Sequence, residues 1–269
     1  MNFHSDEWIM NEVKKHCDES LNYFSKDNIV GIFYQGSGNY GLDYEDSDVD
    51  TKLIAVPSFK DIAMNKQPIS TTHVRANDEH IDFKDIRLYM QTFRKQNLNF
   101  LEILFTPYYS LNDDYADEWM RLIEAREDIA HMNPYQAVKS MQGIAKEKYH
   151  AMEHHYPTRM HMIEKYGYDP KQLHHLLRVQ EYLKRYVVGE SYESCLQPRN
   201  HEYLVEVKKG LHALDEAREL ATASITDIDN VCKKFFEVVK KPEENTEIRE
   251  LLDDVQYNIM KIAVGKEFK

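Results

Sequence analysis

The chain reads IVGIFYQGSGNYGLDYEDSDVDTKLIAV over residues 29–56, two apolar runs separated by a polar, glycine-rich segment. This pattern predicts a strand over 29–35, a Gly-Ser turn, a short loop and a second strand over 49–56. Side chains two residues apart in a strand point to the same face. We therefore expect Asp48 and Asp50 to project side by side at the start of the second strand.

Two adjacent carboxylates repel each other, and a divalent cation would remove that repulsion. The preceding turn, Gly36-Ser37, can present backbone N–H groups and a hydroxyl to a phosphate. Asp-rich turns are common, so an isolated Asp-x-Asp could be an ordinary loop edge. The Gly-Ser turn at this distance, with apolar strands on both sides, favours a phosphate and metal site. The other loop acids are assigned to solvation or capping of the loop: Asp43, Glu45 and Asp46.

The segments Gly36–Leu42 and Asp46–Asp50 resemble the DNA polymerase beta-like nucleotidyltransferase superfamily. The likeness is greatest to a bacterial and phage branch that is associated with RNA ligases. Two further segments fit that branch, and the resemblance covers residues 29 to about 188. One is 81–87, which leads into 97–105, and the other is 167–178.

The resemblance implies transfer of a nucleoside monophosphate from a nucleoside triphosphate to an acceptor hydroxyl, with Mg²⁺ or Mn²⁺ as cofactor. In this superfamily the metal ions are held by about three carboxylates, the third on a neighbouring strand. Asp48 and Asp50 match the first two, and Asp82, between Ile81 and Phe83, matches the third. Asp82 would then also activate the acceptor hydroxyl. Asp85 is the competing candidate, as a carboxylate at a helix N-terminus, and we favour Asp82.

The resemblance assigns the triphosphate to Gly36 and Ser37. It also suggests phosphate contacts from a helix expected over 170–188, where Lys171, His174 or His175, and Arg178 share one face. A solvated basic face or an internal ion pair would give the same pattern.

Composition limits the possible functions. The chain has 269 residues and a formal net charge of −12, so a nucleic-acid substrate would need a local basic groove. Three cysteines without metal-type spacing favour a reducing compartment. No apolar run has membrane-spanning length, and the N-terminus lacks the features of a signal peptide. We therefore expect a cytoplasmic protein that does not enter membranes, and we assign no oligomeric state.

The expected fold class is α+β, with a small mixed β-sheet as nucleotidyltransferase core and a C-terminal helical region. Two domains are expected, a catalytic domain over 1–110 and a helical domain over 111–269. Further strands are predicted at 69–75 and 79–84, and none after residue 112. Helices are predicted on either side of the last strand. One begins at 85, and the others span 6–25, 100–105, 112–128, 134–155, 158–166, 170–188, 201–223, 226–240 and 246–264.

The function expected from these residues is metal-dependent nucleotidyl transfer, with an RNA or tRNA end as the acceptor. One alternative is nucleotidylation of a protein or a small molecule. Another is a nucleotide-binding regulatory module without catalysis. A contiguous basic cleft leading from the carboxylates would favour RNA, and a closed small pocket would favour a small acceptor.

Overall fold

The computed structural model describes residues 3–45, 47–241 and 243–269. Its internal contacts divide the chain into two compact units. The first is Met1–Met132 together with Glu244–Lys269, and the second is Asn133–Glu243. The sequence places the domain boundary at 110/111, whereas these units divide after Met132, and the last helix belongs with the first unit.

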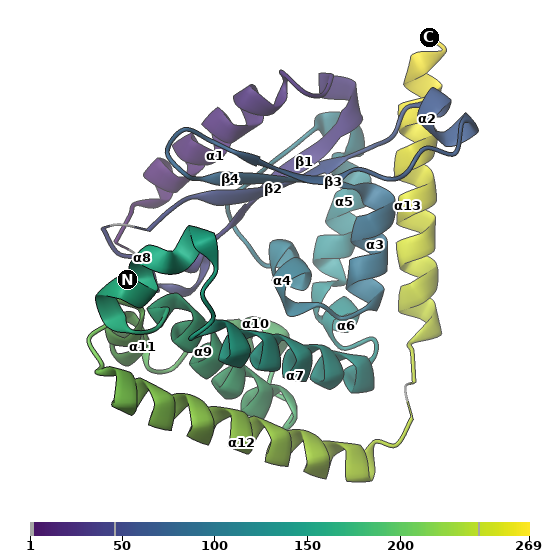
Figure 1. The fold of residues 1–269 in the computed structure, drawn as a ribbon. Helices are drawn as coiled ribbons and strands as arrows, with labels where there is room; N and C mark the ends of the chain where they lie inside the picture. The colour runs from purple at the N-terminus through teal and green to yellow at the C-terminus, as the bar shows by residue number, and fades with distance from the viewer. Residues whose placement is uncertain (1–2, 46, 242) are drawn as a thin grey trace. The chain divides into compact units, whose positions relative to one another are not determined.

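The first unit is built on a five-stranded mixed sheet with the order β3-β4-β2-β1-β5 (Figure 1). Neighbouring β2 and β4 run parallel, and every other pair is antiparallel. The sheet confirms the expected mixed core. Only β5 was not predicted, because three residues are too few to show a period of two. The strands are β1 Ile29–Gln35, β2 Asp50–Ala55, β3 Ser70–Val74, β4 His80–Asp85 and β5 Tyr109–Leu111.

One face of the sheet is covered by α1 (Asp6–Ser20), which begins where the Ser5 hydroxyl accepts the N–H of Trp8. Its apolar positions Ile9 and Val13 are fully buried against the strands. The strand residues of this core are spaced two apart, as expected for side chains on one face of a sheet. They are Ile32, Tyr34, Leu53, Ala55, Ile81 and Phe83.

The other face carries the helices of the first unit, and Trp119 packs on Phe33 with ring centroids 4.9 Å apart. The C-terminal helix returns to this unit because Leu252, Val255 and Ile259 form one buried stripe. It packs on α5 and α3 (Figure 1). The helices are α2 Phe59–Ala63, α3 Ile86–Arg94, α4 Leu98–Leu101, α5 Asp113–Glu124, α6 Arg126–Ala130 and α13 Thr246–Glu267.

Two of the expected helix starts can be compared with the structure in this unit. Asp85 caps α3 and accepts the N–H of Arg87. The other helix begins before residue 100, because the Asn97 side chain accepts the N–H of Asn99 and caps α4. A helix predicted over 100–105 is therefore a short turn of α-helix followed by a 3₁₀ turn over Glu102–Leu104.

The second unit is entirely helical in its described residues, which confirms a C-terminal helical region and the α+β class. Asn133-Pro134 and Asp169-Pro170 begin helices as predicted, with proline in the first turn. Its helices are α7 Pro134–Ala151, α8 Met160–Tyr166, α9 Pro170–Tyr186, α10 Tyr192–Leu196, α11 His201–Lys208 and α12 Leu214–Val238.

The predicted break between the helices over 201–223 and 226–240 is in the wrong place. The chain leaves the helix near Gly210, whose φ of 73° is left-handed, and α12 then runs unbroken across 224–226. Glycine adopts that conformation at little cost, whereas nothing between 223 and 226 breaks a helix.

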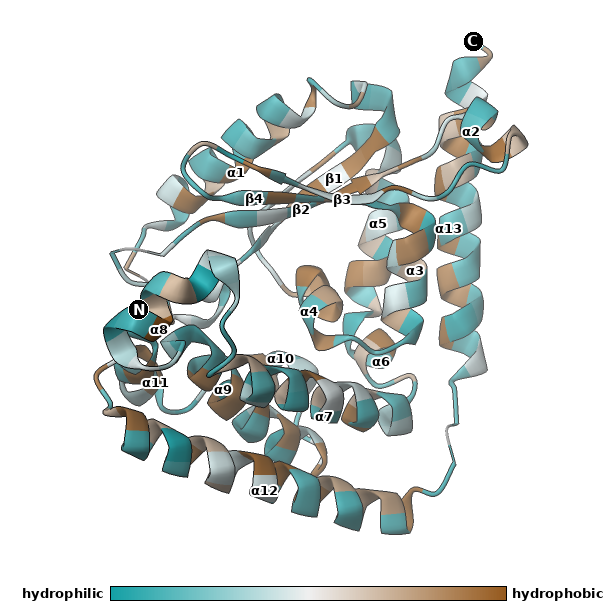
Figure 2. Ribbon diagram, viewed as in Figure 1, coloured by the Kyte–Doolittle hydropathy of each residue, from teal (hydrophilic) through white to brown (hydrophobic). Residues whose placement is uncertain are grey.

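Apolar residues concentrate on β1, whereas α3 carries both apolar and polar residues and α1 is largely hydrophilic outside its core-facing positions (Figure 2). Among the helices that the structure describes, none combines the length and the apolar character that crossing a membrane requires.

Candidate active site

The glycine-rich turn lies on the ring of Tyr34. A Cβ added at Gly36 would be 2.5 Å from the Tyr34 Oη, and one at Gly38 would be 2.8 Å from it. The Gly38 N–H donates to the same oxygen over 3.1 Å. Glycine is therefore required at both positions for the backbone to follow this path. The predicted turn is present as a 3₁₀ turn over Ser37–Tyr40.

Side-chain bonds attach this loop to the rest of the unit. The Ser37 Oγ lies 3.4 Å from the Ser47 Oγ, which joins the two ends of the loop. The Tyr40 hydroxyl donates to the buried carboxylate of Glu102. Asp43 is buried and accepts the N–H of His4 over 2.9 Å. Asp46 lies outside the described residues.

Asp48 and Asp50 stand at the start of β2, on either side of the fully buried Val49. Asp48 is exposed and Asp50 is half-buried, so both remain open to solvent. Asp50 Oδ1 accepts the backbone N–H of His80 over 2.9 Å, and His80 Nδ1 lies 3.1 Å from the same oxygen. These contacts fix the Asp50 carboxylate. The sequence did not single out His80, although it lies two residues before Asp82 on the same strand.

Asp82 lies on the same face of the sheet as Asp50. In the parallel pairing of β2 with β4, Lys52 is opposite Asp82, and Lys52 and Asp50 share a face because they are two residues apart. Asp82 Oδ1 accepts a hydrogen bond from the Thr72 hydroxyl over 3.1 Å. Its Oδ2 lies 3.5 Å from Lys52 Nζ.

Asp85, the competing candidate, has a different environment. It is buried, caps α3, and binds the Arg87 guanidinium through both oxygens over 2.9 and 2.7 Å. Its register partner is Ala55, which places it on the opposite face from Asp82. Asp85 thus stabilises the junction of β4 with α3, whereas Asp82 shares the sheet face of Asp50.

Lys52 is the buried cation of this face. Its side chain is 7% exposed, and its Nζ lies 4.2 Å from the centroid of the Phe100 ring. Lys84 Nζ lies 4.0 Å from the same centroid. Burial lowers the pKa of Lys52, and the charges of Asp82 and Glu102 oppose that shift. The rule that pairs Asp48 with Asp50 also extends to Lys52, which is the signal that could have found it.

Only a few side chains near the turn could act as ligands for a metal ion. Among the described residues, no three His, Cys, Asp or Glu side chains are arranged as a metal-binding group. Asp48 and Asp50 supply hard carboxylate oxygens beside a turn suited to phosphate. Mg²⁺ is usually bound by one or two carboxylates together with water and substrate phosphates. The pair therefore fits a cation that arrives with a triphosphate.

A family model described as "RNA repair pathway DNA polymerase beta family" (RlaP) matches residues 13–257, most of both units. The chain belongs to this family. The match confirms the resemblance to polymerase beta-like nucleotidyltransferases and to their RNA-repair branch. No protein in the curated set matches the chain.

In this member of the RNA repair pathway family, the predicted phosphate-binding helix is α9 of the second unit. Asp169 caps it by accepting the N–H of Lys171, and Arg159 binds the Asp169 carboxylate over 2.8 and 3.0 Å. Lys171 and Arg178 are half-buried on this helix.

His174 does not fit its predicted role. It is 2% exposed, and its Nδ1–H donates to the Leu204 carbonyl over 2.9 Å. Burial lowers the pKa of His174 to about 3, because desolvation outweighs the hydrogen bond. A neutral imidazole enclosed between α9 and α11 cannot serve as a cation for phosphate. His174 is therefore a packing residue, and the prediction of a phosphate contact is corrected here.

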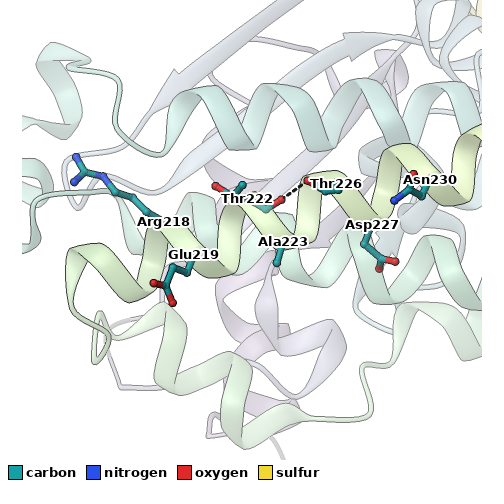
Figure 3. Close-up of a pocket in the computed structure, with 7 residues that line it drawn as sticks. All are labelled: Arg218, Glu219, Thr222, Ala223, Thr226, Asp227 and Asn230. Atoms are coloured by element: carbon teal, nitrogen blue, oxygen red, sulfur yellow. Dashed lines mark hydrogen bonds between the residues drawn. The ribbon is translucent and has the colours of Figure 1, made fainter.

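The second unit of this RNA repair family member also has an open hollow of about 570 Å³ along α12. None of the predicted site residues lines it (Figure 3). One of its hydroxyls, that of Thr226, is already bonded to the Thr222 carbonyl over 2.7 Å. The hollow is lined by Arg218, Glu219, Thr222, Ala223, Thr226, Asp227 and Asn230.

Proposed function

We propose that the chain transfers a nucleoside monophosphate from a nucleoside triphosphate to a hydroxyl at an RNA or tRNA end. One observation carries this proposal. Asp50 is the register partner of Gln35, and the Gly36-Ser37 turn begins at the next residue. Asp50 and the Gly36-Ser37 turn are therefore adjacent on two paired strands, as the proposal requires.

In this proposal Asp48 and Asp50 hold Mg²⁺ or Mn²⁺ with the triphosphate. When bound, the ion would neutralise phosphate oxygens and stabilise the pyrophosphate leaving group. The N–H groups of the Gly36-Ser37 turn and the Ser37 hydroxyl orient the triphosphate. They act by positioning, since phosphoryl transfer needs little covalent help from the protein.

Asp82 is the proposed acceptor for the proton of the attacking hydroxyl. The acceptor oxygen forms its bond to the α-phosphorus, the bond from that phosphorus to pyrophosphate breaks, and the proton passes to the Asp82 carboxylate. The Lys52 ammonium lies 3.5 Å from this carboxylate and holds it in place on the sheet. The further expectation that Asp82 binds metal remains a prediction.

RNA is the proposed acceptor because the family belongs to RNA repair and because α9 carries Lys171 and Arg178. These cations would bind phosphates, Arg178 by a bidentate fork and Lys171 as a point charge. With a net charge of −12, any RNA contact must depend on such local cations.

The test is incubation of the full chain with each labelled nucleoside triphosphate, Mg²⁺ and a mixture of RNAs with defined ends. We expect label on an RNA end with wild-type protein and none with Asp50→Asn. Label on the chain itself or on an added protein would instead support protein nucleotidylation. Nucleotide binding without transfer to RNA, protein or small alcohols would favour the non-catalytic alternative.

A further inference from the structure

Both oxygens of Asp82 already have partners in the protein. The Thr72 hydroxyl donates to Oδ1 over 3.1 Å, and Lys52 Nζ lies 3.5 Å from Oδ2. Asp50 differs, since both contacts from His80 go to Oδ1. Among the residues that the structure describes, Asp50 Oδ2 has no such contact. Asp82 and Asp50 therefore differ in how many of their carboxylate oxygens the protein already engages.

Burial and neighbouring groups fix the position of the Lys52 ammonium group. Its side chain is 7% exposed, and its Nζ lies over the Phe100 ring. The buried carboxylate of Glu102 also attracts it. Glu102 is itself bonded by Tyr40 and by the Gln35 amide over 2.6 Å. Moving Lys52 aside would leave the buried Glu102 carboxylate without this cation, which is unfavourable.

A divalent cation bound by Asp82 would have to lie close to this fixed ammonium. Like charges at such a distance repel strongly in a partly desolvated site. The Asp48 end of the face lies farther from Lys52 along β2, and there two carboxylates are open to solvent. Lys52 already compensates the charge of Asp82, so a single divalent ion at Asp48 and Asp50 is enough to balance the remaining carboxylates of this face.

We propose that the Lys52 ammonium takes, beside Asp82, the place that a second metal ion has in two-metal phosphoryl-transfer sites. The chain then binds one divalent cation with its nucleotide, through Asp48 and Asp50. This inference rests on the proposed function, because it concerns the same site. Lys52 is a positioning residue here, since it acts through Asp82.

The test counts Mn²⁺ bound to the full chain by equilibrium dialysis in the presence of a saturating, non-hydrolysable nucleoside triphosphate analogue. We expect one ion per chain in the wild type. Two ions would overturn the inference and leave the proposed function intact. No bound ion would reject the proposed function, and the inference with it.

Variants of Lys52 test the number of bound ions further. Lys52→Met removes the charge and keeps a side chain of similar length, so a second ion should bind through Asp82. Adding Asp82→Asn to that variant should return the count to one. Lys52→Arg, which keeps the charge, should stay at one.

Lys84→Met is the matched control, since Lys84 contacts the same Phe100 ring and should leave the count at one. A folded Lys52→Met protein that still binds one ion would overturn the proposal. The wild-type count decides it if that variant does not fold.

Discussion

Lys52 and Asp82 are register partners in the neighbouring parallel strands β2 and β4, and their charged groups lie 3.5 Å apart. This ion pair stands on the face that also carries Asp50. The Asp82 carboxylate is thereby held on the sheet by a cation from the protein itself. The pair links the packing of the strands to the chemistry proposed for the face.

Asp48→Asn and Asp50→Asn should each reduce nucleotidyl transfer by about 100-fold or more, a magnitude typical of removing one preorganised electrostatic contact. Both side chains lie at a solvent-exposed strand start, so the melting temperature should change little. Single-turnover transfer and thermal unfolding measure the two effects. Glu45→Gln, in the same loop and exposed, is the control. Activity within twofold of wild type in both aspartate variants would refute the metal assignment.

Asp82→Asn and Asp85→Asn should separate activity from stability. Asp82→Asn should lower transfer while the protein stays folded, because Asp82 is partly exposed at the proposed site. Asp85→Asn weakens a buried pair with Arg87 and should lower the free energy of unfolding by about 1–3 kcal/mol. Urea denaturation and transfer assays on both proteins check this. The reverse pattern would make Asp85 the third carboxylate.

Gly36→Ala and Gly38→Ala should weaken triphosphate binding, because the new Cβ would overlap the Tyr34 ring and shift the turn. Gly143→Ala is the matched control. Its Cβ would meet nothing within 4 Å in α7, and alanine should stabilise that helix by about 0.5–1 kcal/mol. Nucleotide titration followed by fluorescence or calorimetry gives the affinities. Unchanged affinity in both turn variants would show that the turn does not hold the phosphates.

Glu79 should make the first unit sensitive to acid. Burial by itself would raise the pKa of Glu79, but hydrogen bonds from His16, Asn77 and Arg75 outweigh it and lower the pKa to about 2. A folded-state pKa below the unfolded value means that the stabilisation is present above the unfolded pKa. It is lost as the pH falls from about 4.5 toward 2. The contribution is about 3 kcal/mol at neutral pH.

The measurement is the free energy of unfolding of wild type and Glu79→Gln against pH. The difference between them should be constant near neutrality and shrink below pH 4.5. A difference that does not change between pH 6 and 2.5 would show that Glu79 is not held ionised by its partners.

His174 and Arg178 should behave differently although they lie one turn apart on α9. His174→Ala leaves the Leu204 carbonyl without its donor and opens a cavity, so it should destabilise the protein by about 1–3 kcal/mol. Arg178→Ala should weaken RNA binding in a salt-dependent way. Melting curves and RNA titrations at two salt concentrations test both. A His174 variant of normal stability with weak RNA binding would restore its predicted role.

The sequence was sufficient for the strands and the turn beside the proposed site. The apolar runs on either side of 36–50 predicted both strands, and the juxtaposition of Asp48 with Asp50 stays a prediction. Glycines at 36 and 38 predicted a turn with close backbone contact, which the Tyr34 ring explains. These features depend on residues near in sequence, so periodicity and backbone preferences determine them.

Contacts distant in sequence were decided only by the tertiary structure. The parallel register of β2 with β4 brings Lys52 against Asp82, and no local pattern specifies that register. The same holds for the burial of His174 beneath α11 and for the return of α13 to the first unit. Amphipathic spacing predicts that one face of a helix will be buried. The surface that covers this face depends on how all the apolar faces of the chain pack together in the folded protein.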